Sequence, residues 1–343
     1  MKNIPIALSN ARQAAYARNN VSLDLANADL PSGTLCLAND SLLRNTEVIE
    51  ELTLFAASYD SMTGNGLARL RDFLAPPRPS GSRIVRLTTM NELEPWETVD
   101  YNKVKRGEMA DFAEIRQRTA TKTDFQINNR GLSVILDRDE LRDKPEWQQM
   151  HTKWLIDLLN RATVQEAIAI YFAAATPSSL TWSSGSPNPD INIRNLLLTA
   201  ANVTGFYPQN AAYGDAAFLL RATAYESELT AGSMARASVY TEEQLATALG
   251  VSQALINMER YQNTTTAKVE LIGSNVLLFT AVKDAGPADP SNLVRHVVTG
   301  SGASGEYAVY VTDIGVKKIM LTVENYELLH VQHTTGIYKV AVS

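Results

Sequence analysis

The chain has 343 residues, of which 45% are hydrophobic and 20% are charged, so it is long enough to form two or three globular domains. Its formal net charge of −6 argues against strong nucleic-acid binding, and its single cysteine, Cys36, excludes an intrachain disulfide. The sequence contains no run of about 18 apolar residues that could span a membrane, and the first residues lack the apolar core of a signal peptide. We therefore expect an intracellular, or at least disulfide-free, protein.

The first 83 residues are predicted to be a mixed N-terminal region, with short helices at 41–57 and 66–74. The stretch from Ala75 to Ser82 is rich in proline and serine. Proline disfavours helix and favours extended chain, so this stretch is predicted to be a linker.

Residues 84–136 are predicted to form a polar, β-like arm. Ile84–Thr89 is rich in β-branched residues and predicts a strand, and the segments 112–119 and 125–128 mix polar and apolar residues in a strand-like way. The arm is poor in large aliphatic residues, and an isolated hairpin is only marginally stable in water. We therefore expect the arm to need another surface to lie on, and a neighbouring subunit is one candidate.

The strongest helical signal covers residues 143–177. Asp143 and Glu146 form a capping-box-like start, and Pro177 ends the run. Such a helix would have about 31 residues and a length of roughly 45 Å. Its second half is apolar almost all round and is expected to be buried more deeply than its first half. The residues predicted to face the core recur at helical spacing and are Trp147, Met150, Trp154, Leu158, Ala162, Ile168 and Phe172.

The remainder of the chain predicts a compact α+β region. A helix is predicted at 191–204, followed by a turn at 205–208. Thr241 and Gln244 predict a capping box at the start of a short helix that Gly250 ends. Strands are predicted at 251–261, 269–282, 317–323, 326–332 and 337–342.

Three glycines near the C-terminus match a dinucleotide-binding fingerprint. Gly300, Gly302 and Gly305 fit the pattern G-x-G-x-x-G and follow a strand-like stretch. The fingerprint requires a helix after the glycines, because the N–H groups at the start of that helix bind the pyrophosphate. Residues 306–312 are instead β-branched and aromatic, which predicts a strand. We therefore interpret the glycines as a hairpin loop between two strands.

Motifs for catalysis and metal binding are absent from the sequence. There is no P-loop, no nucleophile elbow, no H-E-x-x-H pattern and no cysteine cluster. His330 and His333 lie in a predicted strand, where residues three apart point to opposite faces and cannot share a metal. The acidic group at 137–140 lacks the glycine and spacing of a calcium loop. We therefore predict that the chain is not an enzyme, with no catalytic, cofactor-binding or metal-binding residues and no cofactor.

The order of the predicted pieces resembles that of tailed-bacteriophage major capsid proteins of the Hong Kong 97-type fold. The resemblance covers about residues 84–343. Thr181-Trp182 just after the long helix fits the family, whereas Pro189-Asp190 and the separation of Pro208 from Asn210 are small departures from it. The stretches that carry the resemblance are TDFQINNRGLSVILDRDEL, TWSSGSPNPDINIRNLLLTAANVTGFYPQNAAYGDAAFLL, YTEEQLATALGVSQALINMERYQ and GSNVLLFTAV.

The resemblance implies an α+β fold with an N-terminal arm, a hairpin called the E-loop, a spine helix in a peripheral P-domain, and an axial A-domain. The implied divisions are an N-terminal extension at 1–83, the E-loop and entry strand at 84–140, the spine helix at 141–180, the A-domain at 181–280, and a return to the P-domain sheet with the C-terminal strands at 281–343.

The function implied by the resemblance is that of a major capsid protein. Its copies would assemble into pentamers and hexamers of an icosahedral shell around double-stranded DNA, without sequence-specific contact and without a membrane. The implied partners are further copies of the chain and scaffolding, portal and head-decoration proteins. The implied location is the virion, after assembly in the bacterial cytoplasm. Two alternatives stay open, an encapsulin-like nanocompartment shell protein and, less favoured, a nicotinamide-dependent enzyme built on the glycine loop.

Overall fold

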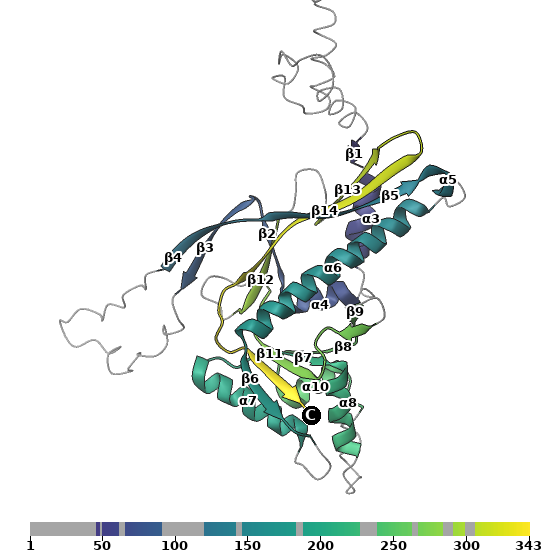
Figure 1. Cartoon of the computed structure of the whole chain (residues 1–343). Helices are drawn as coiled ribbons and strands as arrows, with labels where there is room; N and C mark the ends of the chain where they lie inside the picture. Colours follow the sequence, from purple (N-terminus) through teal and green to yellow (C-terminus); the bar gives the residue numbers. More distant parts are fainter. Residues whose placement is uncertain are drawn as a thin grey trace, which may run out of the picture. The chain divides into compact units, whose positions relative to one another are not determined.

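The computed structural model describes residues 46–48, 50–61, 66–90, 120–141, 146–182, 188–226, 239–262, 267–283, 291–298 and 306–343. The chain divides into two compact units, each made of three separate segments (Figure 1). The first unit comprises residues 1–59, 131–156 and 302–324, and the second comprises 60–130, 157–301 and 325–343. Strand β5 (Asn128–Asp137), helix α6 (Trp147–Ala174) and strand β14 (Lys318–Val331) each have several residues in both units.

The first unit contains paired strands and helices. Strand β1 (Thr46–Val48) pairs antiparallel with β13 (Tyr307–Asp313), which lies next to β14. Helix α3 (Glu50–Asp60) buries Leu52 and Ala56, and the Thr53 hydroxyl accepts a hydrogen bond of 3.3 Å from the Val309 N–H. The short helix α5 (Arg138–Leu141) follows β5.

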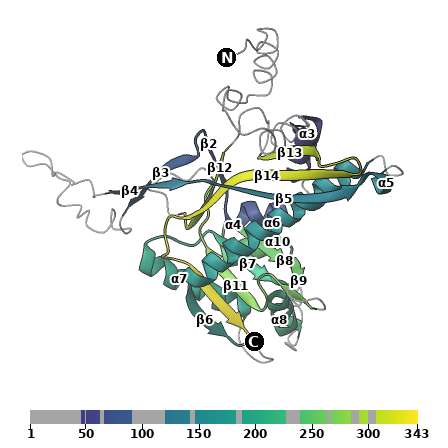
Figure 2. The same ribbon diagram turned by 45° about the horizontal axis from the view of Figure 1, so that its top comes forward.

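The second unit contains a mostly buried five-stranded sheet. Its strands, in spatial order, are β6 (Thr176–Leu180), β15 (Tyr338–Val342), β11 (Asn275–Phe279), β7 (Asn210–Gly214) and β8 (Gln253–Asn257). Helices α7 (Pro189–Thr204), α8 (Asp215–Glu226) and α10 (Glu242–Leu249) accompany this sheet (Figure 2). Every residue of β7 is buried, as expected for a strand inside a covered sheet.

The rest of the second unit surrounds the C-terminal half of α6. Strand β12 (Leu293–Val298) pairs with the second half of β14 and with β2 (Pro77–Ser80). Helix α4 (Gly66–Leu74) contributes Leu70 and Leu74 to a core that includes Tyr171 of α6. Strands β9 (Arg260–Gln262) and β10 (Lys268–Glu270) form a separate pair. Strands β3 (Ile84–Met90) and β4 (Ala120–Gln126) form an antiparallel ribbon that extends to one side of the unit (Figures 1 and 2).

Several local predictions are confirmed. Helices α4 and α7 lie close to where they were predicted, α6 covers most of the predicted long helix, and β3 covers the predicted strand. The predicted capping box is present, because the Thr241 side chain accepts from the Gln244 N–H while the Gln244 side chain accepts from the Thr241 N–H. Gly250 ends α10 with a positive φ of 75°, a conformation that glycine adopts at little cost. The strand segments 317–323 and 326–332 form one continuous strand, β14.

The prediction of a linker at 75–82 is wrong. Residues Pro77–Ser80 form β2, which pairs parallel with β12 at the edge of its sheet. Proline lacks an N–H group but is tolerated on an edge strand, where one side of the strand needs no ladder partner. The prolines therefore limit this segment to the edge of the sheet and do not remove it from the sheet.

The predicted buried face of the long helix is also wrong. Of the seven residues predicted to face the core, Ile168 alone is buried, while Met150 and Trp154 are 51% and 50% exposed. Between Ala167 and Ala175, only Ala167, Ile168 and Tyr171 are buried, so the expected deeper burial of the second half is not observed. The helix has apolar residues on more than one face, and polar residues within the true face interrupt its pattern. The residues that are buried are Thr152, Leu155, Ile156, Leu159, Asn160, Thr163, Val164, Ala167, Ile168 and Tyr171.

The interpretation of the glycine loop is correct in one respect and wrong in another. The predicted strand after the glycines is confirmed, because β13 begins at Tyr307. The predicted hairpin is wrong, because β12 pairs with β14 and β2, whereas β13 pairs with β1 and lies next to β14. The glycines themselves lie at 299–305, outside the described residues, as do Cys36 and the predicted strand at 112–119. Helix α8 was not predicted.

Candidate functional site

The histidines of the second unit lie together, although not in a metal site. His296 of β12 is 2% exposed, and its ring centroid is 6.2 Å from that of His330, which in turn lies 5.0 Å from the Phe125 ring. Burial, assisted by the nearby charges of His330 and Arg78, lowers the pKa of His296 to about 4. Burial also lowers the pKa of His330. Both imidazoles are therefore neutral at neutral pH.

The acidic group at 137–140 takes part in ion pairs. Asp139 accepts a hydrogen bond of 2.9 Å from Lys317, and Arg138 pairs with Asp313. Within the ranges that the structure describes, no three His, Cys, Asp or Glu residues are grouped as a metal site would require. In the same part of the chain, no helix is both long and apolar enough to cross a membrane.

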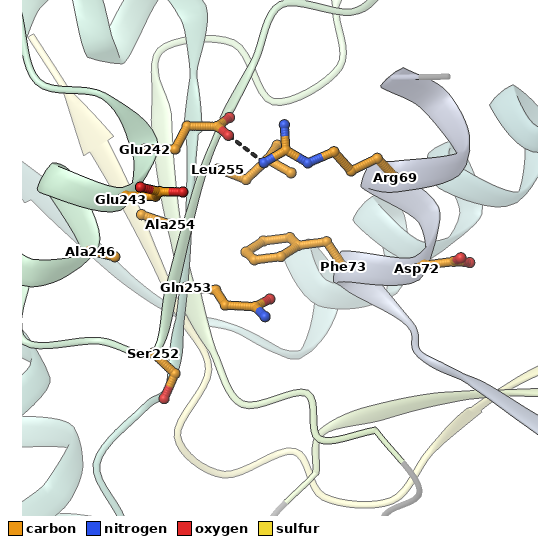
Figure 3. Close-up of a pocket in the computed structure, with 10 residues that line it drawn as sticks. All are labelled: Arg69, Asp72, Phe73, Glu242, Glu243, Ala246, Ser252, Gln253, Ala254 and Leu255. Atoms are coloured by element: carbon orange, nitrogen blue, oxygen red, sulfur yellow. Dashed lines mark hydrogen bonds and ion pairs between the residues drawn. The ribbon is translucent and has the colours of Figure 1, made fainter. Parts of the chain in front are cut away.

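A cleft of about 470 Å³ lies between α4 on one side and α10 with β8 on the other (Figure 3). Arg69 reaches across it to form an ion pair with Glu242, and the Phe73 ring lies below that pair. The other carboxylate oxygen of Glu242 accepts a hydrogen bond of 3.0 Å from the N–H of Ile256 on β8. Glu242 therefore connects α4, α10 and the edge strand β8.

Two carboxylates of the cleft lining take part in contacts between elements of the second unit. Asp72 points away from the cleft (Figure 3), and its carboxylate accepts from Arg71 at 2.9 Å and from Arg295 at 3.0 Å. Ser252 provides a hydroxyl, and Glu242 and Glu243 provide carboxylates, of which Glu242 is held by Arg69 and by the N–H of Ile256. We interpret the cleft as a structural contact between α4 and the five-stranded sheet.

The β3–β4 ribbon exposes most of its described side chains. It forms a two-stranded sheet of its own, with pairs that run from Ile84↔Gln126 to Met90↔Ala120. The ribbon side chains that the structure describes are exposed, apart from the half-buried Val85 and Phe125, and Ile84 is 65% exposed. Among the described residues, no third strand pairs with either outer edge of the ribbon, which makes the ribbon a candidate for contacts with another chain.

Other exposed apolar side chains lie on helices. Met150 and Trp154 are one turn apart on the first-unit half of α6. Ile191 and Leu198 are two turns apart on α7, and they are 48% and 55% exposed. Exposed apolar side chains that share a helix face are a common feature of protein–protein contact surfaces. Sequence reasoning assigned Trp154 to the core, and its periodicity alone could not separate the two faces of the helix.

Comparison with known proteins gives a structural match. No family model matches the sequence, and no curated protein matches it. The structure is similar to that of a phage-related protein from Bordetella bronchiseptica RB50, with a TM-score of 0.60 and 15% identity over 86% of this chain and 96% of that chain. This likeness shows the fold and confirms the α+β, Hong Kong 97-type fold that the resemblance implied.

Two further solved structures are similar at lower TM-scores. One is the putative capsid protein of a prophage of E. coli CFT073, with a TM-score of 0.47 and 11% identity over 87% of this chain and 100% of that chain. The other is a virus-like particle from Pyrococcus furiosus, with a TM-score of 0.45 and 12% identity over 83% of this chain and 97% of that chain.

Proposed function

We propose that this chain is the major capsid protein of a tailed bacteriophage. Its copies assemble into pentamers and hexamers of an icosahedral shell that encloses double-stranded DNA. The observation that carries the proposal is the exposed β3–β4 ribbon on a Hong Kong 97-type fold. The fold alone is compatible with more than one function, so the proposal rests on this surface and on the sequence resemblance.

The ribbon supports assembly because its own subunit does not stabilise it well. Two-stranded sheets are marginal in water, and here the described side chains of both strands are mostly exposed. A neighbouring copy can supply a packing face and backbone partners for such a ribbon. We infer that the ribbon strands β3 and β4 lie across the adjacent subunit, while β5 stays paired with β14 of its own subunit.

We assign the functional regions of the chain according to the divisions that the resemblance implies. Residues 84–140 act as the E-loop with its entry strand, 141–180 as the spine helix, 181–280 as the A-domain, and 281–343 as the return to the P-domain. Residues 1–83 form an N-terminal extension. Scaffolding, portal and decoration proteins are the further partners, and the chain resides in the virion after assembly in the bacterial cytoplasm.

The net charge of the chain and the strand after its glycine run fit a shell protein that encloses DNA. Its net charge of −6 favours weak, sequence-independent contact with the enclosed DNA. A strand, β13, follows the glycine run where a dinucleotide site would need a helix, and this argues against the nicotinamide-dependent alternative. We propose no catalytic role, cofactor or metal for the chain.

Electron microscopy of the expressed protein tests the proposal. The chain, alone or with the products of its neighbouring genes, is expected to form shells, tubes, sheets or capsomers. Shells that contain protein cargo in place of DNA would favour the nanocompartment alternative. A monomer in sedimentation at every concentration and salt tried would contradict the proposal. Micromolar binding of a nicotinamide nucleotide, lost in Gly302→Val, would support the enzyme instead.

A further inference from the structure

Arg130 lies where the ribbon joins the body of the second unit. It is the third residue of β5, and β5 begins two residues after β4 ends. Ile127, between the two strands, is 2% exposed, and its N–H donates a hydrogen bond of 2.7 Å to the Arg83 carbonyl. The start of β3 and the end of β4 are therefore tied together at this point, which we call the ribbon root (residues 83–84 and 125–130).

One face of β14 is held by Arg130. Its guanidinium donates a hydrogen bond of 3.1 Å to Glu327 of β14 and forms a second ion pair with Glu166 of α6. Glu327 is 1% exposed and also accepts a hydrogen bond from Thr163 of α6. A planar guanidinium can bind two carboxylates at fixed angles, which a lysine ammonium cannot do as well.

The opposite face of β14 is held by other root residues. Tyr326 precedes Glu327, so its side chain points to the other face of the strand. The Arg83 guanidinium lies 4.1 Å from the centroid of the Tyr326 ring and donates a hydrogen bond to its hydroxyl. Asn129 donates to the same hydroxyl at 3.2 Å. The ribbon root thus contacts both faces of β14 at two consecutive residues.

Behind Glu327, a buried polar chain continues into the core. Arg295 of β12 is fully buried, lies 3.5 Å from Glu327 and donates to Asp72 of α4. Asp72 also accepts from Arg71, which donates a hydrogen bond of 2.6 Å to Asn160 of α6. Loss of Arg130 would leave the buried Glu327 carboxylate with Arg295 and Thr163 as partners. Arg130 itself is partly exposed, at 27% of its side chain.

We propose that Arg130 is a positioning residue that sets the direction in which the β3–β4 ribbon leaves the subunit. It does so by fixing the ribbon root to α6 through Glu166 and to β14 through Glu327, against the Tyr326 contacts on the other face. The inference about the direction of the ribbon rests on these contacts alone. The importance of that direction for shell assembly rests on the proposed function.

Spin-label distances in the unassembled full-length chain test this proposal. Labels at Thr123→Cys and Ala162→Cys, in a Cys36→Ser background, report the distance from the ribbon to α6, because both positions are exposed. Arg130→Gln is expected to broaden the distance distribution and to accelerate hydrogen exchange at 123–130 by about tenfold, as loss of charged hydrogen bonds predicts. Arg130→Lys should give a distance distribution and an exchange rate between those of the unaltered chain and those of Arg130→Gln. Arg86→Gln is the matched control, since it breaks an exposed ion pair on the same ribbon.

The two possible failures give different results. An unchanged distance distribution and unchanged exchange in Arg130→Gln would overturn the positioning role, whether or not shells form. An equal broadening in Arg86→Gln would overturn it too, because the effect would belong to any charge on the ribbon. If Arg130→Gln unfolds the chain, Glu166→Gln removes only the α6 contact and should still broaden the distribution. Absence of shells from the unaltered chain would instead count against the proposed function and leave the root geometry standing.

Discussion

Two arginine–aspartate pairs in the second unit have nearly the same geometry in opposite surroundings. Arg221 donates to Asp190 at 2.7 and 2.8 Å in the region of the five-stranded sheet, and Arg86 donates to Asp124 at 2.7 and 3.0 Å on the ribbon. The side chains of the first pair are 0% and 12% exposed, and those of the second are 68% and 50% exposed. The two pairs therefore differ in burial and not in geometry. The fold depends on the buried pair, whereas water can replace the contact of the exposed pair.

The same contrast separates the two regions as a whole. The five-stranded sheet has its own core and buries Arg221 among the rings of Phe218, Tyr225 and Tyr240. The described side chains of the ribbon mostly face solvent, and none of them belongs to either described core cluster. The first region is therefore stabilised within one subunit, whereas under the proposed function the ribbon is completed by another chain. This distinction gives different expectations for mutations in each.

The largest expected effect is on assembly and comes from shortening the ribbon arm. Replacement of residues 98–122 by a short Gly-Ser bridge should leave a folded subunit, because the described cores of the second unit are built from residues in other parts of the chain. Shells should fail to form or become irregular. Circular dichroism and thermal melting check the fold, and electron microscopy checks assembly. Normal shells from the deletion variant would show that the arm is a passive loop.

The next largest effect is on stability and comes from breaking the buried pair. Asp190→Ala leaves the Arg221 charge buried without its carboxylate and should reduce the free energy of unfolding by about 3–5 kcal/mol. Asp124→Ala is the matched control and should leave the denaturant midpoint unchanged, because water replaces the lost contact at that exposed site. Equal losses in the two variants would contradict the role assigned to burial.

The sequence predicted much of the fold because several signals were local. These signals include the Thr241–Gln244 capping box, the end of helix α10 at Gly250 and the length of α6. Each depends on a few neighbouring residues. The resemblance supplied the fold class, which composition and periodicity could not. Strand pairing was not predictable, since β12 and β13 are neighbours in sequence but pair with other strands. The ribbon-root contacts were missed for the same reason, because Arg130 and Glu327 are 197 residues apart.

A smaller effect is expected on the pH dependence of stability, and it belongs to the buried region. The Nε2 atom of His296 is buried and has no hydrogen-bond partner among the described residues, so protonation would place an unpaired charge in the interior. Its pKa is about 4 in the fold, against 6.5 in the unfolded chain. The unfolded state therefore binds more protons as the pH falls below about 6.5, and stability declines until about pH 4.

Denaturant titrations between pH 7 and pH 4 measure this decline. His296→Gln cannot gain a proton and should flatten the curve in that window, after comparison of the two chains at pH 7. His151→Gln is the control, since His151 is only half-buried on α6. A decline of the same slope in His296→Gln would assign the acid sensitivity to other groups, with His330 the next candidate because burial lowers its pKa as well.

The smallest effect on stability is expected at Trp154. It tests the contrast between buried and exposed residues within helix α6. Trp154 is 50% exposed, whereas its neighbour Leu155 is 2% exposed. Trp154→Ala should change the free energy of unfolding by less than about 1 kcal/mol, because substitutions on exposed surfaces remove little packing. Leu155→Ala should cost about 2–5 kcal/mol, because it leaves a cavity. If the exposed face of α6 contacts another copy in the shell, Trp154→Ala should still raise the protein concentration needed for assembly. A loss of stability as large as that of Leu155→Ala would mean that the Trp154 ring is buried in the free subunit after all.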